Sequence, residues 1–279
     1  MKKISRRSFL AAAGLSVAAL ALTACGGSAS SVASSVASSA SSAAASTSAA
    51  AGELTTVEAG KLTMATNAAF PPYEMTTDAG DFEGIDIETA QAIADKLGLE
   101  LQIDDMDFDA ALLSVQQGKA DIVMAGVTVT DERKAVMDFS DSYATGIQSI
   151  IVPEGSDIAS PDDLAGKKIG TQRGTTGYIY CSDDFGDENV VAYDDGLTAV
   201  QALNNGQVDA VVIDNAPAKE FVAANPGLVI LDTNYAEEDY AIGMAKGNTA
   251  LEDAVNAALE ELKADGTLQS IVDKYIVAE

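Results

Sequence analysis

Short apolar runs alternate with longer amphipathic stripes along most of this chain. The short runs predict strands over 61–66, 99–103, 121–125, 168–171, 190–193, 209–214 and 228–231. The stripes predict helices over 87–97, 108–117, 197–203, 216–224, 251–263 and 268–276. A further helix start is predicted at Ser160, because Pro161 and two aspartates follow it. This alternation predicts βαβ units and a largely parallel sheet.

One pattern occurs twice. Residues 111–123 and 199–211 both have the pattern of a helix, a glycine and an aspartate that opens a buried strand. Gly118 and Asp121 in the first copy match Gly206 and Asp209 in the second. The repeat predicts two lobes, although common α/β patterning within one lobe would produce the same echo.

The end of the chain indicates how two lobes would be joined. The helices predicted after Asp232 have no counterpart in the second half, so we expect them to return to the first lobe. The chain then crosses between the lobes twice, near 146–152 and 232–240. Two adjacent crossings make a hinge, and a hinge between lobes leaves a cleft that can close on a small ligand.

Residues 1–25 are typical of an export signal. Two lysines and Arg6-Arg7 precede an apolar run that is shorter than the roughly 20 residues that cross a bilayer. The run ends at Leu22-Thr-Ala-Cys25, which resembles the lipobox of bacterial lipoproteins, where the cysteine is acylated. An ordinary secretory signal is the alternative, and the arginine pair leaves the twin-arginine and general export routes open. Residues 26–52 are almost entirely Ser, Ala, Val, Thr and Gly, which predicts a flexible tether.

The charge and the missing residue types narrow the chemistry. The net charge is −27, which excludes nucleic-acid binding because phosphate contact requires a basic face. The chain has no histidine, the usual general base and the commonest zinc ligand, and we expect neither a metal nor another cofactor. Cys181 follows Ile179 and Tyr180 and is predicted to be a packing residue, with a reactive thiol as the alternative.

Four segments together resemble the polar-amino-acid family of solute-binding proteins that feed bacterial ABC importers. They are Thr66-Asn-Ala-Ala-Phe-Pro-Pro-Tyr73, Gly84-Ile-Asp-Ile87, Gly126-Val-Thr-Val-Thr-Asp-Glu-Arg133 and Val208-Asp-Ala-Val-Val-Ile-Asp214. The resemblance implies an α/β, two-lobed, periplasmic-binding-protein-like (type II) fold with two hinge crossings and a ligand cleft between the lobes. Residues 53–148 and 237–279 would form lobe 1, and residues 149–236 would form lobe 2.

Arg133 is the predicted contact for the carboxylate of an amino-acid ligand. Both charged groups of a zwitterion lose water when a cleft closes, so each needs an opposite charge or oriented dipoles. The planar guanidinium of Arg133 suits a carboxylate, and Arg133 follows the predicted helix cap Thr130. The resemblance gives the matching position the same role. A surface ion pair of Arg133 with Asp131 or Glu132 is the alternative.

The resemblance assigns the remaining polar contacts. Positions matching Gly126, Thr128 and Thr176 assist on the carboxylate, and a plain helix cap is the alternative for Thr176. Asp214 ends a predicted buried strand, where ligand-binding groups commonly lie in α/β sheets, and the resemblance makes it the ammonium acceptor. A helix cap is its alternative too. A guanidinium on lobe 1 and a carboxylate on lobe 2 would couple binding to closure.

Asn67, Phe70, Asp86 and Phe108 match positions that line the side-chain pocket of the family. The two phenylalanines would sandwich a side chain, or they are core aromatics. Asp86, near Glu83, would hold a cationic group, or it belongs to an ordinary strand-to-helix junction. Basic-amino-acid binders in the family typically have aspartate where this chain has Asn67, which argues against lysine or arginine. Glutamine, arginine and cystine all stay open.

These features predict a monomeric, lipid-anchored binding protein on the extracytoplasmic face of the cell membrane. It would capture a polar or basic L-amino acid and deliver it to an ABC permease. An enzyme of the same fold, similar to dehydratases that act on small carboxylates, is the alternative, and the lack of histidine argues against it. A receptor sensor is a poorer alternative, because such a domain normally continues into a spanning helix.

Overall fold

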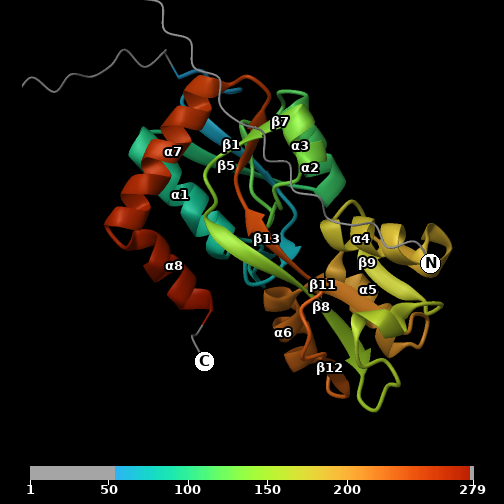
Figure 1. The fold of residues 1–279 in the computed structure, drawn as a ribbon. Coiled ribbons are helices and arrows are strands. Elements are labelled where there is room, and N and C mark those ends of the chain that lie inside the picture. The colour runs from blue at the N-terminus through green and yellow to red at the C-terminus, as the bar shows by residue number, and fades with distance from the viewer. Residues whose placement is uncertain (1–53, 277–279) are drawn as a thin grey trace, which may run out of the picture. The chain divides into compact units, whose positions relative to one another are not determined.

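Two β-sheets form the framework of the computed structural model, which describes residues 54–276 (Figure 1). In the first sheet the strand order is β5 (Glu100–Asp105), β1 (Lys61–Thr66), β6 (Ile122–Val123), β14 (Gly243–Ala245) and β7 (Met137–Phe139). In the second sheet it is β10 (Val190–Tyr193), β9 (Ile169–Gln172), β11 (Ala210–Asp214), β8 (Ala144–Pro153) and β12 (Leu228–Ile230), and β13 (Ala236–Tyr240) also pairs with β8. A small third sheet contains β2 (Ala69–Phe70), β3 (Glu74–Thr76) and β4 (Phe82–Glu83). The predicted export signal, Cys25 and the predicted tether lie outside the described residues.

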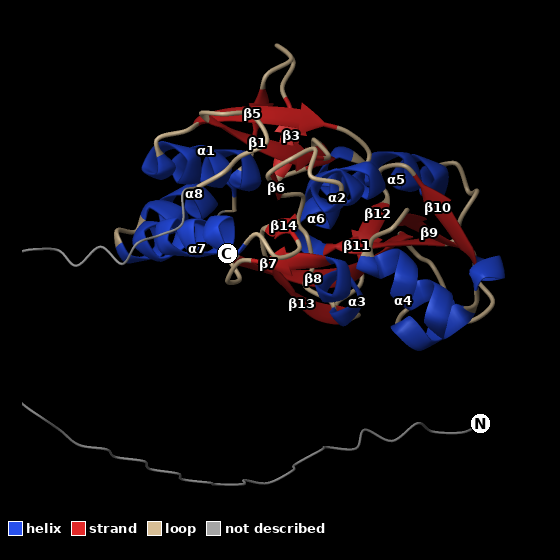
Figure 2. Cartoon of the chain, turned by 90° about the horizontal axis from the view of Figure 1, so that it is seen from above, coloured by secondary structure: helices blue, strands red, loops and turns tan. Residues whose placement is uncertain are grey.

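Helices pack against both sheets. The helices around the first sheet are α1 (Ile85–Leu97), α2 (Phe108–Gln116), α3 (Asp131–Val136), α7 (Thr249–Ala264) and α8 (Thr267–Tyr275), and those around the second are α4 (Thr176–Phe185), α5 (Gly196–Asn204) and α6 (Asn215–Ala224). The last two helices, α7 and α8, pack on α1, beside the first sheet (Figure 2). The sequence analysis expected the end of the chain to return to the first half in this way. The helix predicted at Ser160 is only a 3-10 turn, Pro161–Leu164, with a capping box between Ser160 and Asp163.

The prediction of a largely parallel sheet is wrong, because both sheets are mixed. In the first sheet β1 pairs in parallel with β5 and β6, but β14 runs antiparallel to its neighbours. In the second, β9 pairs in parallel with β10 and β11, but β8 is antiparallel to each of its partners. The physical reason lies in the crossings: β8 carries the chain from the first sheet to the second, and β13 carries it back beside β8 in the opposite direction.

The repeated pattern corresponds to a repeated local structure. The Asp121 carboxylate accepts the backbone N–H of Thr63 on β1 at 2.8 Å, and the Asp209 carboxylate accepts that of Lys168 before β9 at 2.8 Å. Gly118 and Gly206, which follow the preceding helices, both have φ of 65°, a conformation that favours glycine. Each aspartate therefore links the start of its own strand, β6 or β11, to the neighbouring parallel strand, β1 or β9, through a side-chain hydrogen bond.

Cys181 is a packing residue, as predicted. Its side chain is fully buried in an apolar cluster with Ile150, Leu164 and Ile169. Burial raises the pKa of this thiol to about 12, so it stays protonated and unreactive at neutral pH. None of the helices described between residues 54 and 276 has both the length and the apolar character needed to cross a bilayer.

Candidate functional site

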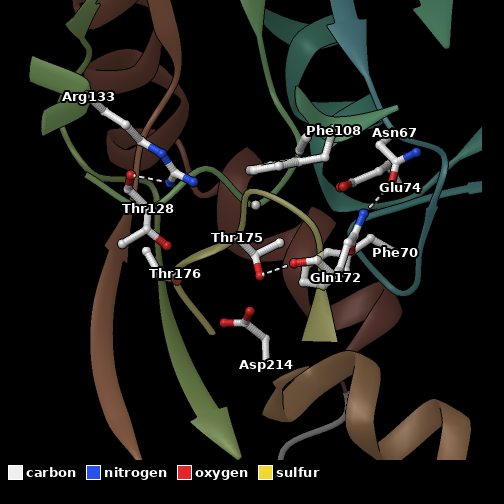
Figure 3. A pocket seen from close by; sticks show the side chains of 12 residues that line it. Asn67, Phe70, Glu74, Phe108, Thr128, Arg133, Gln172, Thr175, Thr176 and Asp214 are labelled. Carbon is white, nitrogen blue, oxygen red and sulfur yellow. Dashed lines mark hydrogen bonds between the residues drawn. The ribbon is translucent and has the colours of Figure 1, made fainter. Parts of the chain in front are cut away.

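A polar pocket lies where the ends of strands from both sheets meet (Figure 3). Its walls are formed by Asn67, Phe70, Glu74, Phe108, Ala125, Gly126, Thr128, Arg133, Gln172, Thr175, Thr176 and Asp214. All of the ligand-binding residues predicted from the sequence are present except Asp86. Among residues 54–276 no group of three or more acidic or cysteine side chains is arranged to hold a metal.

The guanidinium of Arg133 lies in the pocket and donates to carbonyls of the segment before its own helix and of the loop after β9. Thr130 caps α3 as predicted, because its hydroxyl accepts the Arg133 backbone N–H at 3.2 Å. Nη1 donates to the Thr128 carbonyl at 2.8 Å, and Nη2 donates to the Gly174 carbonyl at 3.1 Å. The guanidinium carbon lies 5.3 Å from the centre of the Phe108 ring. Since the side chain is only 8% exposed, the alternative of a surface ion pair is wrong.

Asp214 lies at the end of β11, where its carboxylate accepts two hydrogen bonds. The Tyr240 hydroxyl donates to Oδ1, and Gln148 Nε2 donates to Oδ2 at 2.8 Å. Asp214 also occupies the N-cap position of α6, as its alternative role predicted, but its side chain makes no capping hydrogen bond to that helix. Burial raises the pKa of Asp214 to about 7, although the two donors act in the opposite direction. A cationic group beside Asp214 would favour its ionised form.

Glu74 is a pocket acid that the sequence analysis missed. Its side chain is fully buried, and neither carboxyl oxygen accepts a hydrogen bond from an N–H or hydroxyl donor among residues 54–276; its carboxyl neighbour is Asp86. Burial, and secondarily the neighbouring charge of Asp86, hold the pKa of Glu74 well above its usual range. Glu74 directly follows the first family-like segment, which ends at Tyr73, so its position was the available signal.

Asp86 has a supporting position rather than the predicted place in the pocket wall. It is fully buried, and its Oδ2 accepts the backbone N–H of Gly126 at 3.0 Å. Its own N–H donates to the Tyr73 carbonyl at 2.8 Å. Asp86 therefore fixes two pocket segments from behind. Its alternative as part of the strand-to-helix junction describes the structure better, since α1 begins at Ile85.

Asn67, Phe70 and Phe108 line the part of the pocket that also contains Glu74 (Figure 3). The Asn67 amide is engaged on both sides, because Nδ2 donates to the Met106 carbonyl at 3.0 Å and Oδ1 accepts from Gln172 Nε2 at 2.8 Å. Gln172, at the end of β9, was not predicted. The two phenylalanine rings are buried but line the pocket, so they serve both as wall and as core.

Thr128 and Thr176 share one acceptor that the sequence analysis did not identify. Their hydroxyls donate to the same oxygen of Glu238, Oε2, at 3.0 and 2.9 Å respectively. Thr176 is not a helix cap, because the cap of α4 is Thr175, whose hydroxyl accepts the Tyr178 N–H at 3.3 Å. Glu238 lies on the crossing strand β13 and is buried. No periodic pattern distinguishes it from the acids beside it.

This fold is the two-lobed α/β, type II periplasmic-binding architecture, as solved structures show. An ancestral arginine-binding protein bound to arginine superimposes with a TM-score of 0.74 at 43% identity, covering 78% of this chain and 98% of that one. The model of the bacterial extracellular solute-binding proteins, family 3, matches residues 62–278, and the chain belongs to this family.

Two curated relatives are similar over most of their length. A probable histidine-binding protein of Neisseria gonorrhoeae is 33% identical over 275 residues, which cover 96% of this chain and 95% of that protein. The L-cystine-binding protein TcyJ of Escherichia coli (strain K12) is 34% identical over 226 residues, covering 80% of this chain and 85% of that protein. The relatives therefore differ in the amino acid named for each.

Proposed function

We propose that this protein captures a cationic L-amino acid, with L-arginine as the first candidate, and delivers it to an ABC importer. The observation that carries the proposal is the balance of ionisable groups in the pocket. The pocket lining contains one guanidinium, from Arg133, and two buried carboxyl groups, from Asp214 and Glu74. The buried Glu238 carboxylate lies behind this lining and already accepts hydrogen bonds from Thr128, Thr176 and Gln148. A ligand with one anionic and two cationic groups complements this set, because a buried charge requires an opposite partner.

Each group of arginine has a matching residue. The α-carboxylate would pair with Arg133, and the α-ammonium with Asp214, which also accepts from Tyr240 and Gln148. The guanidinium would pair with Glu74, whose oxygens accept no hydrogen bond from an N–H or hydroxyl donor among the described residues. Phe70 and Phe108 provide apolar walls for the methylene chain between them.

Because of the contacts that Asn67 makes, its lack of charge does not argue against a basic ligand. Its amide is bonded to Met106 and Gln172, so it closes the pocket instead of serving as the counter-charge. Glu74, on the neighbouring hairpin, would provide the negative charge, because a cationic group beside this buried carboxyl favours its ionised form. The ancestral arginine-binding protein described above, solved with arginine, supports this choice of first candidate.

Capture would proceed by closure of two lobes, 53–148 with 237–279 and 149–236. Arg133 comes from the first lobe and Asp214 from the second, so a ligand that contacts both favours the closed arrangement. The proposed boundaries fall on β8 and β13, the strands that cross between the sheets. Hydrogen bonds already join the lobes, among them those from Arg133 to Gly174 and from Gln172 to Asn67.

A thermal-shift screen with arginine, lysine, ornithine, histidine, glutamine and cystine tests this function. At about 100 Kd a ligand of the native state raises the melting temperature by about 5–10 °C. We expect arginine to give the largest shift at equal concentration. A larger shift with glutamine or cystine would contradict the assignment of Glu74. NMR of arginine incubated with the protein separates binding from catalysis, since a new product would favour the alternative of a same-fold enzyme.

We also propose that Cys25 carries a lipid anchor and that residues 26–52 tether the binding unit to the extracytoplasmic face of the cell membrane. The lipobox-like sequence and the composition of the tether support this proposal. Replacement of Cys25 by serine should move the protein from the membrane fraction to the soluble fraction or the medium. Continued membrane retention of Cys25→Ser would contradict the anchor but would leave the binding proposal intact.

A further inference from the structure

Three donors converge on one carboxylate oxygen behind the Arg133 part of the pocket. Thr128 Oγ1 donates to Glu238 Oε2 at 3.0 Å, Thr176 Oγ1 at 2.9 Å and Gln148 Nε2 at 3.0 Å. Thr128 approaches from the first sheet's side, while Thr176 and Gln148 belong to the second. Glu238 itself lies on β13 and is 7% exposed. The two lobes are thus joined through a buried acid.

The number of hydrogen atoms at this junction limits what the hydroxyls can do for a ligand. A threonine hydroxyl has one hydrogen to donate and otherwise presents lone pairs. Thr128 and Thr176 line the pocket, but both direct that hydrogen to Glu238. An incoming carboxylate would therefore meet oxygen lone pairs unless the hydroxyls turn away from Glu238.

The negative charge of Glu238 also works against the binding of a ligand carboxylate. Of the charged groups around Arg133, Glu238 acts on it most strongly, and it opposes the lowering of the guanidinium pKa by burial. Burial and the neighbouring Glu238 also raise the pKa of Tyr180 to about 12. The Glu238 carboxylate therefore partly offsets the positive charge that a ligand carboxylate would use.

We propose that Glu238 is an internal competitor for the ligand carboxylate. It occupies the hydroxyls of Thr128 and Thr176, offsets the charge of Arg133 and so holds the affinity for amino acids below what the pocket would otherwise reach. The inference rests on the proposed function, because it concerns the same carboxylate contact. Weaker binding also favours release of the amino acid, which delivery to an importer requires.

Replacement of Glu238 by glutamine tests the competition. The amide keeps the size of the side chain but accepts hydrogen bonds without a charge, and such bonds are about half as strong. Glu237→Gln is the matched control, because it makes the same change at an exposed position of the same strand. Isothermal titration calorimetry would compare L-arginine with L-argininamide, which has no carboxylate. Circular dichroism and melting temperature verify that each variant is folded.

We expect Glu238→Gln to bind L-arginine at least about tenfold more tightly, on the scale of one charge-assisted hydrogen bond. It should bind argininamide no more tightly than the wild type does, and Glu237→Gln should match the wild type for both. Glu238→Ala, which removes the carboxylate without leaving an amide, is the second variant and should change affinity in the same direction.

Unchanged or weaker arginine binding by folded Glu238→Gln and Glu238→Ala would overturn the inference. So would an equal gain for argininamide, since the effect would then not act through the carboxylate. If the wild type binds arginine but the variants show no gain, only this inference fails. If the wild type binds no amino acid at all, the proposed function fails and the inference falls with it.

Discussion

The two ends of the pocket differ in how far their polar atoms are already satisfied. At the Arg133 end, formed by Arg133, Thr128 and Thr176, the guanidinium donates to two carbonyls and both hydroxyls donate to Glu238. At the Glu74 end, neither oxygen of the buried carboxyl accepts a hydrogen bond from an N–H or hydroxyl donor within residues 54–276. One end is organised around internal bonds, and the other offers an unused acceptor.

The difference suggests that one end of the pocket orients any amino acid and that the other end selects its side chain. A ligand carboxylate must take over donors that already have partners, so the Arg133 end provides orientation common to all amino acids. A ligand that cannot donate a hydrogen bond to the buried Glu74 carboxyl leaves that group unsatisfied. Such a ligand therefore binds with a less favourable free energy than one that can donate. Selectivity is therefore expected at the Glu74 end.

Replacement of Arg133 by alanine should have the largest effect. Removing one partner of a buried charge pair costs about 3–5 kcal/mol, so arginine binding should fall below detection by calorimetry. Arg173→Ala is the control, because that guanidinium is 55% exposed and pairs with Asp194 at 3.4 Å. A surface pair is worth about 0–1 kcal/mol, so the control should bind almost normally. If Arg133→Ala keeps its affinity for arginine, the ligand carboxylate is not bound by Arg133.

Asp214→Asn should weaken every amino-acid ligand by about 1.5–3 kcal/mol, since the ammonium loses a charged acceptor. The loss should be similar for arginine and glutamine, because both carry the α-ammonium. Asp232→Asn, the same change at an exposed site in the same half of the chain, is the control. Wild-type affinity in Asp214→Asn, measured by calorimetry, would mean that the ammonium is held elsewhere.

Glu74→Gln should change selectivity more than general affinity. We expect it to weaken arginine by about 1–2 kcal/mol, because the neutral amide replaces the acceptor of the guanidinium. Glutamine should be affected less or bind better. Glu83→Gln, exposed on the neighbouring strand β4, removes the same charge outside the pocket and should leave both affinities unchanged. Equal losses for arginine and glutamine would show that Glu74 does not select the side chain.

The unliganded protein should become more stable as the pH falls from about 8 to about 5.5. Burial raises the pKa of Asp214 to about 7 and that of Asp86 to about 6. The unfolded chain protonates these carboxyls only near pH 4, so between about pH 4 and 7 the native state binds more protons and gains stability as the pH decreases. The gain should be about 1 kcal/mol or more, and Asp214→Asn should reduce it. A melting temperature that falls over this range, or a slope unchanged in Asp214→Asn, would contradict the assigned burial.

Local patterns predicted seven strands and six helices of the described residues but missed the short strands β2, β3, β4, β7, β13 and β14 and the long crossing strand β8, and they gave no bounds for the helices α3 and α4. β10 has the predicted bounds, Val190–Tyr193, and α1 and α2 begin or end within two residues of their predictions. The mixed character of the sheets was missed because the two reversed strands, β8 and β14, were not predicted, and their partners are far away in sequence. Strand direction at a crossing depends on tertiary connection, which no local pattern records.

Site residues were predicted when both their chemistry and their place in the sequence pointed to a ligand. They were missed when only the packing of the folded chain brings them to the site. Arg133 after a helix cap and Asp214 at a strand end are recognisable in the sequence, and both line the pocket. Glu74 and Glu238 are acids in a very acidic chain, and their importance comes from complete burial rather than from spacing. Asp86 was predicted to line the pocket because it matches a family position, but its carboxylate accepts the backbone N–H of Gly126.

A crystal structure of the protein with L-arginine would test the central claim most directly. The account predicts the α-carboxylate on Arg133, the α-ammonium within hydrogen-bond distance of Asp214 and the guanidinium on Glu74. An arginine bound in the reverse orientation, or with its guanidinium away from Glu74, would contradict it.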